Sequence, residues 1–158
     1  MIVVADSSPL IGLCRIGRFE LLRIVFGRVI VPEAVWREIV LDGRGRPGTE
    51  ELQRASWFEV VPVRTNLPAV AVLELGLDRG EAEAIAVAQE LNADVLLMDE
   101  KLGRATAKQL GLTVTGIVGV LIAAKRRSLA PDAVAVAREL QQNGIWLAEE
   151  LISEIERA

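Results

Sequence analysis

The chain has 158 residues, of which 51% are hydrophobic, 25% are charged and only 4% are aromatic, and its formal net charge is −4. This length fits one domain, and the composition favours a packed core of aliphatic side chains over a disordered chain. We therefore predict a single domain over residues 1–158. General nucleic-acid binders are usually basic, so the acidity indicates either solubility alone or a group of acids that a cation neutralises.

Missing residue types exclude several kinds of chemistry. The sequence contains no histidine, no tyrosine and a single cysteine, Cys14. Ser-His catalysis, histidine-ligated zinc and thiolate zinc clusters are thereby excluded. Carboxylates that bind a hard, oxygen-preferring metal remain the simplest route to catalysis.

The same residues favour a cytoplasmic location. The first ten residues, MIVVADSSPL, lack the basic region of a signal peptide, and no later apolar stretch is long enough to span a bilayer. Cys14 has no second cysteine with which to form an internal disulfide. We therefore expect a protein of the reducing cytoplasm without a membrane segment.

Strands and helices alternate in the first part of the chain. The β-branched run at 2–5 predicts a buried strand, and Ser7 or Ser8 is expected to cap the next helix, with Pro9 in its first turn. The elements that follow are a helix at about 19–25, a strand at 29–31 and a helix from Pro32 to about Val40.

The segment 41–49, LDGRGRPGT, contains a G-x-G-x-x-G string at Gly43, Gly45 and Gly48. A dinucleotide-binding loop needs a strand before it and a helix that opens through it. Here a helix precedes the string and Pro47 interrupts it. We predict a mobile loop instead of a dinucleotide site.

The alternation continues to the C-terminus. The predicted elements are a strand at 57–63, a helix at 78–91, a strand at 95–98, a helix at 101–110, a strand at 112–114 and helices at 117–127, 131–142 and 148–157. Alternating strands and helices imply a parallel sheet covered on both faces, which is a three-layer α/β/α fold.

Two acids directly follow predicted strands. Asp6 comes after the first strand and Asp99 after the fourth, whereas Asp94 precedes its strand. The carboxyl ends of parallel strands meet at one edge of the sheet, where ligands bind. We expect Asp6 and Asp99 at that edge and Asp94 at the opposite one.

A third acid, Glu81, lies on the apolar stripe of its helix and in its first turn, at the same edge. A buried carboxylate without a partner is costly, so its position suggests a function. Three charged side chains of this helix are expected to point the other way: Arg79, Glu83 and Glu90. Fold geometry thus predicts that Asp6, Glu81 and Asp99 face one another.

Each of these acids also has a purely structural explanation. Asp78 and Glu81 form a D-x-x-E capping box, and Asp6 and Asp99 could each cap the helix that follows. If instead the acids cluster, at least one of them should have a raised pKa without a cation. Asp99→Asn should then leave the stability without Mg²⁺ unchanged or raised.

Five sequence stretches together resemble the PIN-domain nucleases, particularly the VapC-like toxins and a closely related subgroup. The stretches are VVADSSPLI at 3–11, VIVPEAVWREI at 29–39, RGEAEAIAVA at 79–88, ADVLLMDEKLGR at 93–104 and GLTVTGIVGVLIAAK at 111–125. They occur in the order in which they stand in that family and cover most of the chain.

This resemblance implies a five-stranded parallel sheet of order 3-2-1-4-5 and an acidic quartet at Asp6, Glu38, Glu81 and Asp99. It also implies that the protein is a Mg²⁺- or Mn²⁺-dependent endoribonuclease. Members of the family are often inhibited by a small antitoxin, and a homodimer is expected. Glu38 depends mainly on the resemblance, because a helical wheel does not separate it from Glu33, and a solvated helix flank explains it equally well.

The expected chemistry is metal-assisted hydrolysis of RNA. Asp6, Glu81 and Asp99 would hold one or two ions that activate a water and neutralise the phosphate. Arg104, one turn into the helix after Asp99, is the candidate phosphate contact, although it could be solvated surface. Ser7 could support the site, although helix capping explains it too.

Three other classes compete with a nuclease. A haloacid-dehalogenase-type phosphatase would need a second Asp at position 8, where Ser8 stands. A receiver domain would need an acid paired with Asp6 and a Lys after the last strand, and neither is evident. A PIN-like binding or antitoxin-docking module with little activity remains the alternative.

Overall fold

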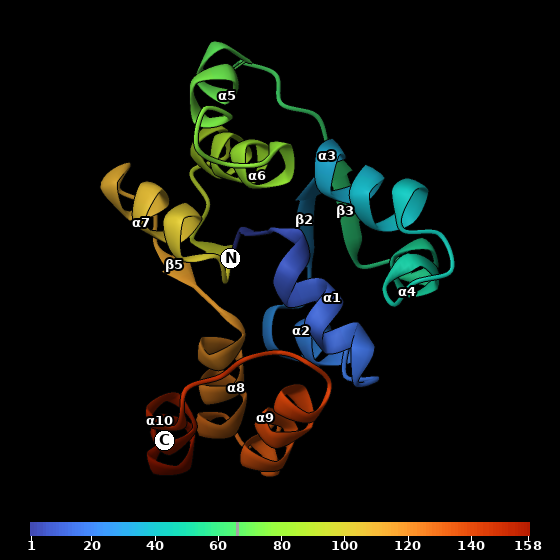
Figure 1. Ribbon diagram of the computed structural model, residues 1–158, viewed down its shortest axis with the longest axis vertical. Helices are drawn as coiled ribbons and strands as arrows, with labels where there is room; N and C mark the ends of the chain where they lie inside the picture. The colour runs from blue at the N-terminus through green and yellow to red at the C-terminus, as the bar shows by residue number, and fades with distance from the viewer. Residues whose placement is uncertain (66) are drawn as a thin grey trace.

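Residues 1–65 and 67–158, which the computed structural model describes, fold around a five-stranded parallel sheet (Figure 1). The strands are β1 (Val3–Ala5), β2 (Val29–Pro32), β3 (Phe58–Val61), β4 (Val95–Leu97) and β5 (Val114–Thr115). They lie in the order β3-β2-β1-β4-β5, and every neighbouring pair is parallel. This order confirms the prediction.

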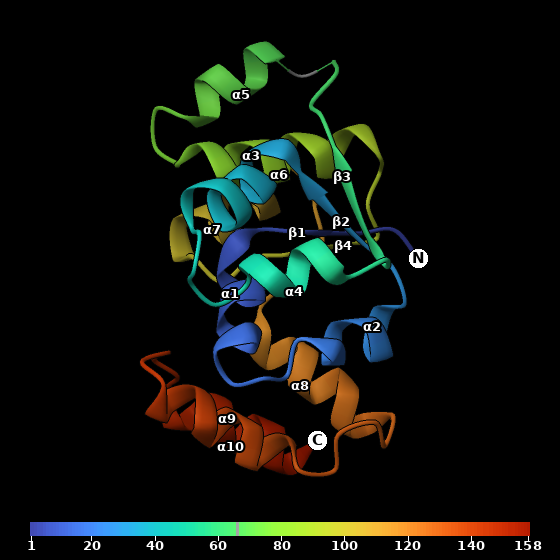
Figure 2. The same cartoon turned by 90° about the vertical axis from the view of Figure 1, so that its right-hand side faces the viewer.

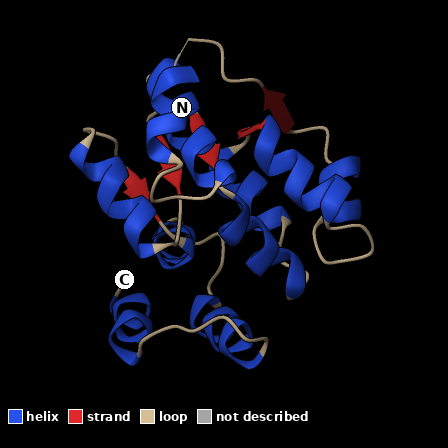
Figure 3. Ribbon diagram, turned by 45° about the horizontal axis from the view of Figure 1, so that its top comes forward, coloured by secondary structure: helices blue, strands red, loops and turns tan. Residues whose placement is uncertain are grey.

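Helices connect the strands and cover the sheet. They are α1 (Ser7–Arg15), α2 (Glu20–Phe26), α3 (Glu33–Trp36), the π-helix η1 (Arg37–Asp42), α4 (Thr49–Arg54), α5 (Leu67–Leu73), α6 (Arg79–Glu90), α7 (Lys101–Gln109), α8 (Ile117–Arg126), α9 (Ala133–Gln142) and α10 (Glu149–Arg157). Figure 3 shows the short strands enclosed by helices.

Alternate residues of β1 face two separate hydrophobic cores, as expected for a strand buried on both sides. Val3 and Ala5 pack in the larger core, to which α1, α2, α8, α9 and α10 contribute. Val4 packs in the second core with Ile85 of α6 and Ala107 of α7. In Figure 2 the sheet is seen edge-on, with α6 on one side and α8 on the other. The three-layer prediction is therefore confirmed.

Two helices, α4 and α5, were not predicted from the sequence. α4 buries Leu52 and Thr49 only, so it carries no periodic apolar stripe. In α5 the whole run LPAVAVL is apolar, so it shows no helical period either. The glycine-rich segment does lie between two helices, η1 and α4, and not between a strand and a helix.

The expected caps of two helices also differ. The N-cap of α1 is Asp6, not Ser7 or Ser8, and its side chain makes no capping hydrogen bond. Glu100, not Asp99, caps α7, because its carboxylate accepts a hydrogen bond from the Gly103 amide at 2.8 Å. Both aspartates are therefore left for other contacts. Among the described helices, none is long and apolar enough to cross a membrane.

Candidate active site

Asp6 lies where β1 ends and α1 begins, at the carboxyl edge of the sheet. Its amide donates to the Leu97 carbonyl oxygen at 2.9 Å, which ties it to the end of β4. The residue is only 1% exposed. Its Oδ1 atom is the one buried side-chain nitrogen or oxygen without a hydrogen-bond partner among the described residues. A buried polar atom without a partner is costly and indicates a ligand or a function.

The pKa of Asp6 is raised from 3.8 to about 7. Burial is the largest cause, and the negative charges of Asp78, Glu81 and Glu38 raise it further, while the Ser7 amide lowers it. Three other carboxylates therefore act on Asp6 without a compensating cation. This meets the expectation that at least one acid of the cluster has a raised pKa.

Glu38 approaches this point from η1. Its Oε1 atom accepts a hydrogen bond from the Ser7 hydroxyl at 3.2 Å. Its Oε2 atom lies 3.1 Å from where a Cβ on Gly80 would be, and Asp78 Oδ1 lies 3.5 Å from the same place. Gly80 thus leaves room for two carboxylates. Partial burial raises the pKa of Glu38, and the Ser7 hydroxyl opposes this.

Glu81 serves its helix and the site together. Its amide donates to Asp78 Oδ1 at 2.8 Å, and its own Oε2 accepts from the Asp78 amide at 3.0 Å, which is the predicted capping box. The residue is 8% exposed, and burial together with Asp78, Glu100 and Glu38 raises its pKa, against the Asp78 amide. Helix capping and membership of the cluster are therefore compatible.

We call Asp6, Glu38, Asp78 and Glu81 the acid cluster. The structure thus adds Asp78 to the predicted residues, because it is among the charges that raise the pKa of each other member. Sequence analysis assigned Asp78 to capping alone. Its position at the N-cap of the helix that carries Glu81 was the signal that it lies at the same edge.

Asp99 lies at the same edge but points elsewhere. Its Oδ1 atom accepts from the Ile117 amide at 2.9 Å, at the beginning of α8, and it packs closely on Gly116. Surrounding protein raises its pKa, whereas the Ile117 amide and the Arg104 guanidinium lower it. In residues 1–65 and 67–158, no three acids are arranged around one possible metal position. The expected convergence of Asp6, Glu81 and Asp99 is therefore not present in this arrangement.

Of the two predicted substrate contacts, one lies beside Asp99 and the other beside the acid cluster. Arg104 is half-buried, and its Nη1 atom donates to the Met98 carbonyl at 2.9 Å beside Asp99. Ser7 is 6% exposed and donates to Glu38, so it holds a carboxylate in place.

Glu83 shares a face of α6 with Arg79, as expected, but this face is covered by other parts of the protein. The residue is 7% exposed, and its carboxylate accepts from the Ala34 amide at 3.1 Å and from Arg79 Nε at 2.6 Å. The reason is that α3 packs against α6 on this side. A wheel of one helix cannot show that a second helix covers its polar face.

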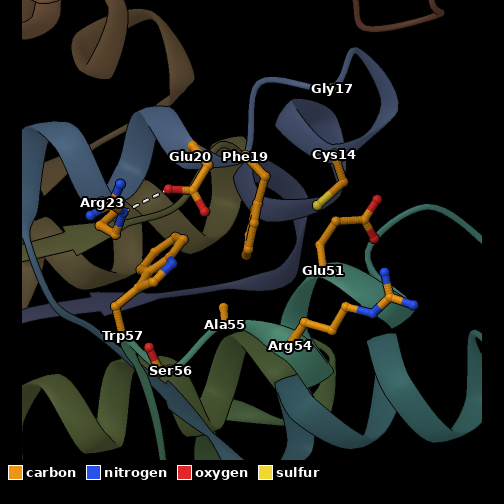
Figure 4. A pocket seen from close by; sticks show the side chains of 10 residues that line it. All are labelled: Cys14, Gly17, Phe19, Glu20, Arg23, Glu51, Arg54, Ala55, Ser56 and Trp57. Carbon is orange, nitrogen blue, oxygen red and sulfur yellow. Dashed lines mark hydrogen bonds and ion pairs between the residues drawn. The ribbon is translucent and has the colours of Figure 1, made fainter.

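Two of three cavities in the structure touch these groups. One of about 600 Å³ is lined by Glu38, Asp78 and Gly80. A second, of about 470 Å³, is lined by Asp99 and Arg104. The largest, of about 730 Å³, lies around the aromatic rings of Phe19 and Trp57 and the buried Cys14, as Figure 4 shows. It shares no lining residue with the acid cluster, so we do not assign the chemistry to it.

The donor set of the acid cluster fits a hard divalent cation. It consists of carboxylate oxygens, which Mg²⁺ and Mn²⁺ prefer, and Asp6 Oδ1 is a buried oxygen with no other partner among the described residues. Burial is the largest cause of the raised pKa values of Asp6, Glu38 and Glu81, and repulsion between neighbouring carboxylates adds to it. A bound cation would relieve the repulsion.

Comparison with known proteins gives the family. A family model described as a PIN domain matches residues 2–158, which is almost the whole chain. No match was found among curated proteins. The matched region includes all of the acid cluster, Asp99 and Arg104, and the strand order is the one that the resemblance implied. The chain therefore belongs to the PIN-domain family, whose members are generally nucleases.

Proposed function

We propose that this protein is a Mg²⁺- or Mn²⁺-dependent endoribonuclease that hydrolyses phosphodiester bonds in RNA. The observation that carries the proposal is Asp6 Oδ1, a buried oxygen with no partner among the described residues and surrounded by other carboxylates. It lies at the carboxyl edge of a parallel sheet, where ligands of such folds bind. The family, whose members are generally nucleases, supports hydrolysis as the reaction.

Asp6, Glu38 and Glu81 would hold the cation once their side chains have moved together, because the described residues place no three acids around one metal position, and Ser7 would keep Glu38 in position through its hydrogen bond. When bound, the ion supplies a water of lowered pKa and positive charge for the phosphate. Asp78 adds negative charge that strengthens cation binding. Asp99 would join the metal ligands by breaking its hydrogen bond with the Ile117 amide. That amide would then be free to donate to a phosphate oxygen.

Arg104 would bind a phosphate of the substrate next to Asp99. Its guanidinium already lies beside that carboxylate, and its Nη1 atom donates a hydrogen bond to the Met98 carbonyl. Removal of one Arg that contacts one phosphate should reduce the slope of log affinity against log salt concentration by about one. RNA affinity should therefore fall only gently with salt, because few phosphates are neutralised.

The experiment is a cleavage assay on a single-stranded RNA with Mg²⁺, Mn²⁺ or EDTA. We expect cleavage that requires the divalent ion, and Asp6→Asn should lower the rate more than about 100-fold, because even groups that only orient metal ligands contribute 10- to 100-fold. Asp94→Asn is the matched control. Asp94 lies at the opposite edge, where it accepts from the Ile2 amide, so this variant should keep its activity.

A binding or antitoxin-docking module is the second candidate. It is favoured by the arrangement of Asp99, which is engaged with α8 and not with the acid cluster. Metal titration separates the two, because a module without activity should lack high-affinity Mn²⁺ binding at Asp6. Purified protein that neither cleaves RNA nor binds Mn²⁺ would decide for the module.

We also propose that the protein is the toxin of a toxin–antitoxin pair and acts in the cytoplasm as a homodimer. The support for a small antitoxin partner and for the dimer is the resemblance to VapC-like toxins. Growth arrest on expression of the wild-type chain, and none with Asp6→Asn, would test the first part. Sedimentation of the purified chain would test the second.

A further inference from the structure

Trp146 is the most exposed aromatic residue among those described, with 83% of its surface accessible. It lies in the loop between α9 and α10, the two helices that lie beside α8 in Figure 1. The residues on either side of it are turned inward, since Leu147 is buried and Ile145 is half-buried. The indole is thus presented to solvent by a backbone whose neighbouring side chains are anchored in the core.

The backbone around Trp146 is fixed by α9. The Ile145 amide donates to the Leu140 carbonyl at 3.0 Å, and Gln141 Nε2 donates to the Leu147 carbonyl at 2.9 Å. Gly144, with a φ of 87°, makes the left-handed turn that ends α9 and permits the first of these bonds. The backbone that carries the indole is therefore ordered before any ligand binds, which lowers the entropic cost of binding.

Trp146 lines the same cavity of about 470 Å³ as Asp99 and Arg104. Its wall also includes Thr115 at the end of β5, Gly116 just before α8 and Glu154 of α10. A continuous surface thus runs from the candidate phosphate contact to the exposed ring. Glu154 carries negative charge on the α10 side, which leaves Arg104 as the place for a phosphate.

The surroundings of Trp146 combine apolar side chains with one basic group. The wall of its cavity holds the half-buried Val118, Ile122 and Leu151 as well as Arg104. An exposed aromatic ring that shares a cavity with a basic side chain matches the way unpaired bases are bound, by stacking on the ring while a cation contacts the backbone.

From this geometry we propose that Trp146 stacks on an unpaired base of the RNA substrate, next to the phosphate held by Arg104. This inference rests on the proposed function, because it specifies the substrate as single-stranded near the cleavage site. It assigns to the α9–α10 loop a role in substrate positioning.

The test measures RNA binding by fluorescence anisotropy of a labelled oligoadenylate in the presence of Ca²⁺. A gel confirms that the RNA stays intact. The second ligand is the same oligomer with one abasic nucleotide placed at each position in turn. One abasic position should weaken binding to the wild-type chain by about 5- to 100-fold, the range for loss of one stacked base. Trp146→Ala should cause the same loss with the intact oligomer and no further loss with that abasic oligomer.

Two control variants complete the design. Trp146→Phe keeps a ring and should retain most of the affinity, while Leu75→Ala removes another side chain that is 88% exposed and should change nothing. The tryptophan emission should fall on addition of RNA to the wild-type chain and not to Trp146→Phe. If Trp146→Ala lowers the affinity for intact RNA and for every abasic RNA by the same factor relative to the wild-type chain, the stacking proposal is overturned.

The outcomes separate this inference from the nuclease proposal. Metal-dependent cleavage without any coupling between Trp146 and a base keeps the nuclease and overturns the stacking site. Base-dependent binding through Trp146 without cleavage keeps the stacking site and overturns the nuclease. A lower mass of Trp146→Ala in sedimentation, without a loss of RNA affinity, would make the residue a contact between two copies of the chain and overturn the stacking site.

Discussion

Asp6 and Asp99 follow neighbouring strands at the same edge of the sheet, yet their surroundings differ. Asp6 is 1% exposed, has one oxygen without a partner among the described residues, and is acted on by three further carboxylates. Asp99 is exposed to solvent, its carboxylate accepts a hydrogen bond from the Ile117 amide, and the Arg104 guanidinium lies beside it. Desolvation by the surrounding protein raises the pKa of both carboxylates, but only that of Asp99 is lowered in turn by a cation, Arg104, whereas like charges raise that of Asp6 further.

This difference shows that position at the edge does not by itself determine what an acid does. At Asp99 an amide and a guanidinium partly offset the cost of desolvating the charge, although desolvation still raises its pKa. At Asp6 the neighbouring carboxylates add to the cost of burial, so protonation or a bound cation is favoured. We therefore infer that Asp6 is the primary metal ligand and that Asp99 has to change its hydrogen bonding before it can bind the ion.

The largest expected effect concerns Asp6 and pH. Its pKa is raised from 3.8 to about 7 in the folded protein, so the folded state binds the proton more tightly than the unfolded state. Its contribution to stability is therefore fully present below pH 4 and is lost as the pH rises to about 7, by up to about 4 kcal/mol in total. The free energy of unfolding, measured with urea in EDTA across this range, should fall accordingly.

Asp6→Asn should remove most of this pH dependence and make the protein more stable than the wild type at pH 8 in EDTA. Asp94→Asn is again the control and should keep the wild-type slope. A slope that is unchanged in Asp6→Asn would show that the cluster carries no unfavourable charge, and the contrast with Asp99 would disappear.

A smaller effect of opposite sign is expected at Asp99. Sequence analysis predicted that Asp99→Asn leaves the ion-free stability unchanged or raised, and this stays a prediction, because an asparagine oxygen can still accept from the first amide of α8, whereas alanine cannot. Asp99→Ala should lower the free energy of unfolding by about 1 kcal/mol, the typical cost of losing such a helix-terminal bond. Urea unfolding in EDTA is the measurement. An increase in stability would place Asp99 within the acid cluster after all.

Much of the fold and part of the site could be predicted from the sequence. Short β-branched runs that alternate with amphipathic helices determined the parallel sheet, and with it the edge where Asp6 and Asp99 lie. The direction of the Asp99 side chain could not be predicted, because it depends on an amide that lies 18 residues later in the sequence. Local patterns contain no information on such a contact.

Glu38 illustrates a second limit. The helix that begins at Glu33 becomes a π-helix at Arg37, so a helical wheel drawn for 3.6 residues per turn does not describe the direction of Glu38. Its place beside Asp78 also requires the missing side chain of Gly80, on another helix. The resemblance to a family identified Glu38, whereas the periodicity of the sequence alone did not.

The most direct test of the account is calorimetry of Mn²⁺ binding at pH 6.5 in buffers of different ionisation enthalpy. If the ion binds at Asp6, whose pKa is about 7, binding must displace its proton. We predict that the wild-type chain releases most of one proton to the buffer, and that Asp6→Asn binds Mn²⁺ far more weakly. Tight Mn²⁺ binding by Asp6→Asn, with the same number of protons released as in the wild-type chain, would contradict the assignment of Asp6 as the primary ligand.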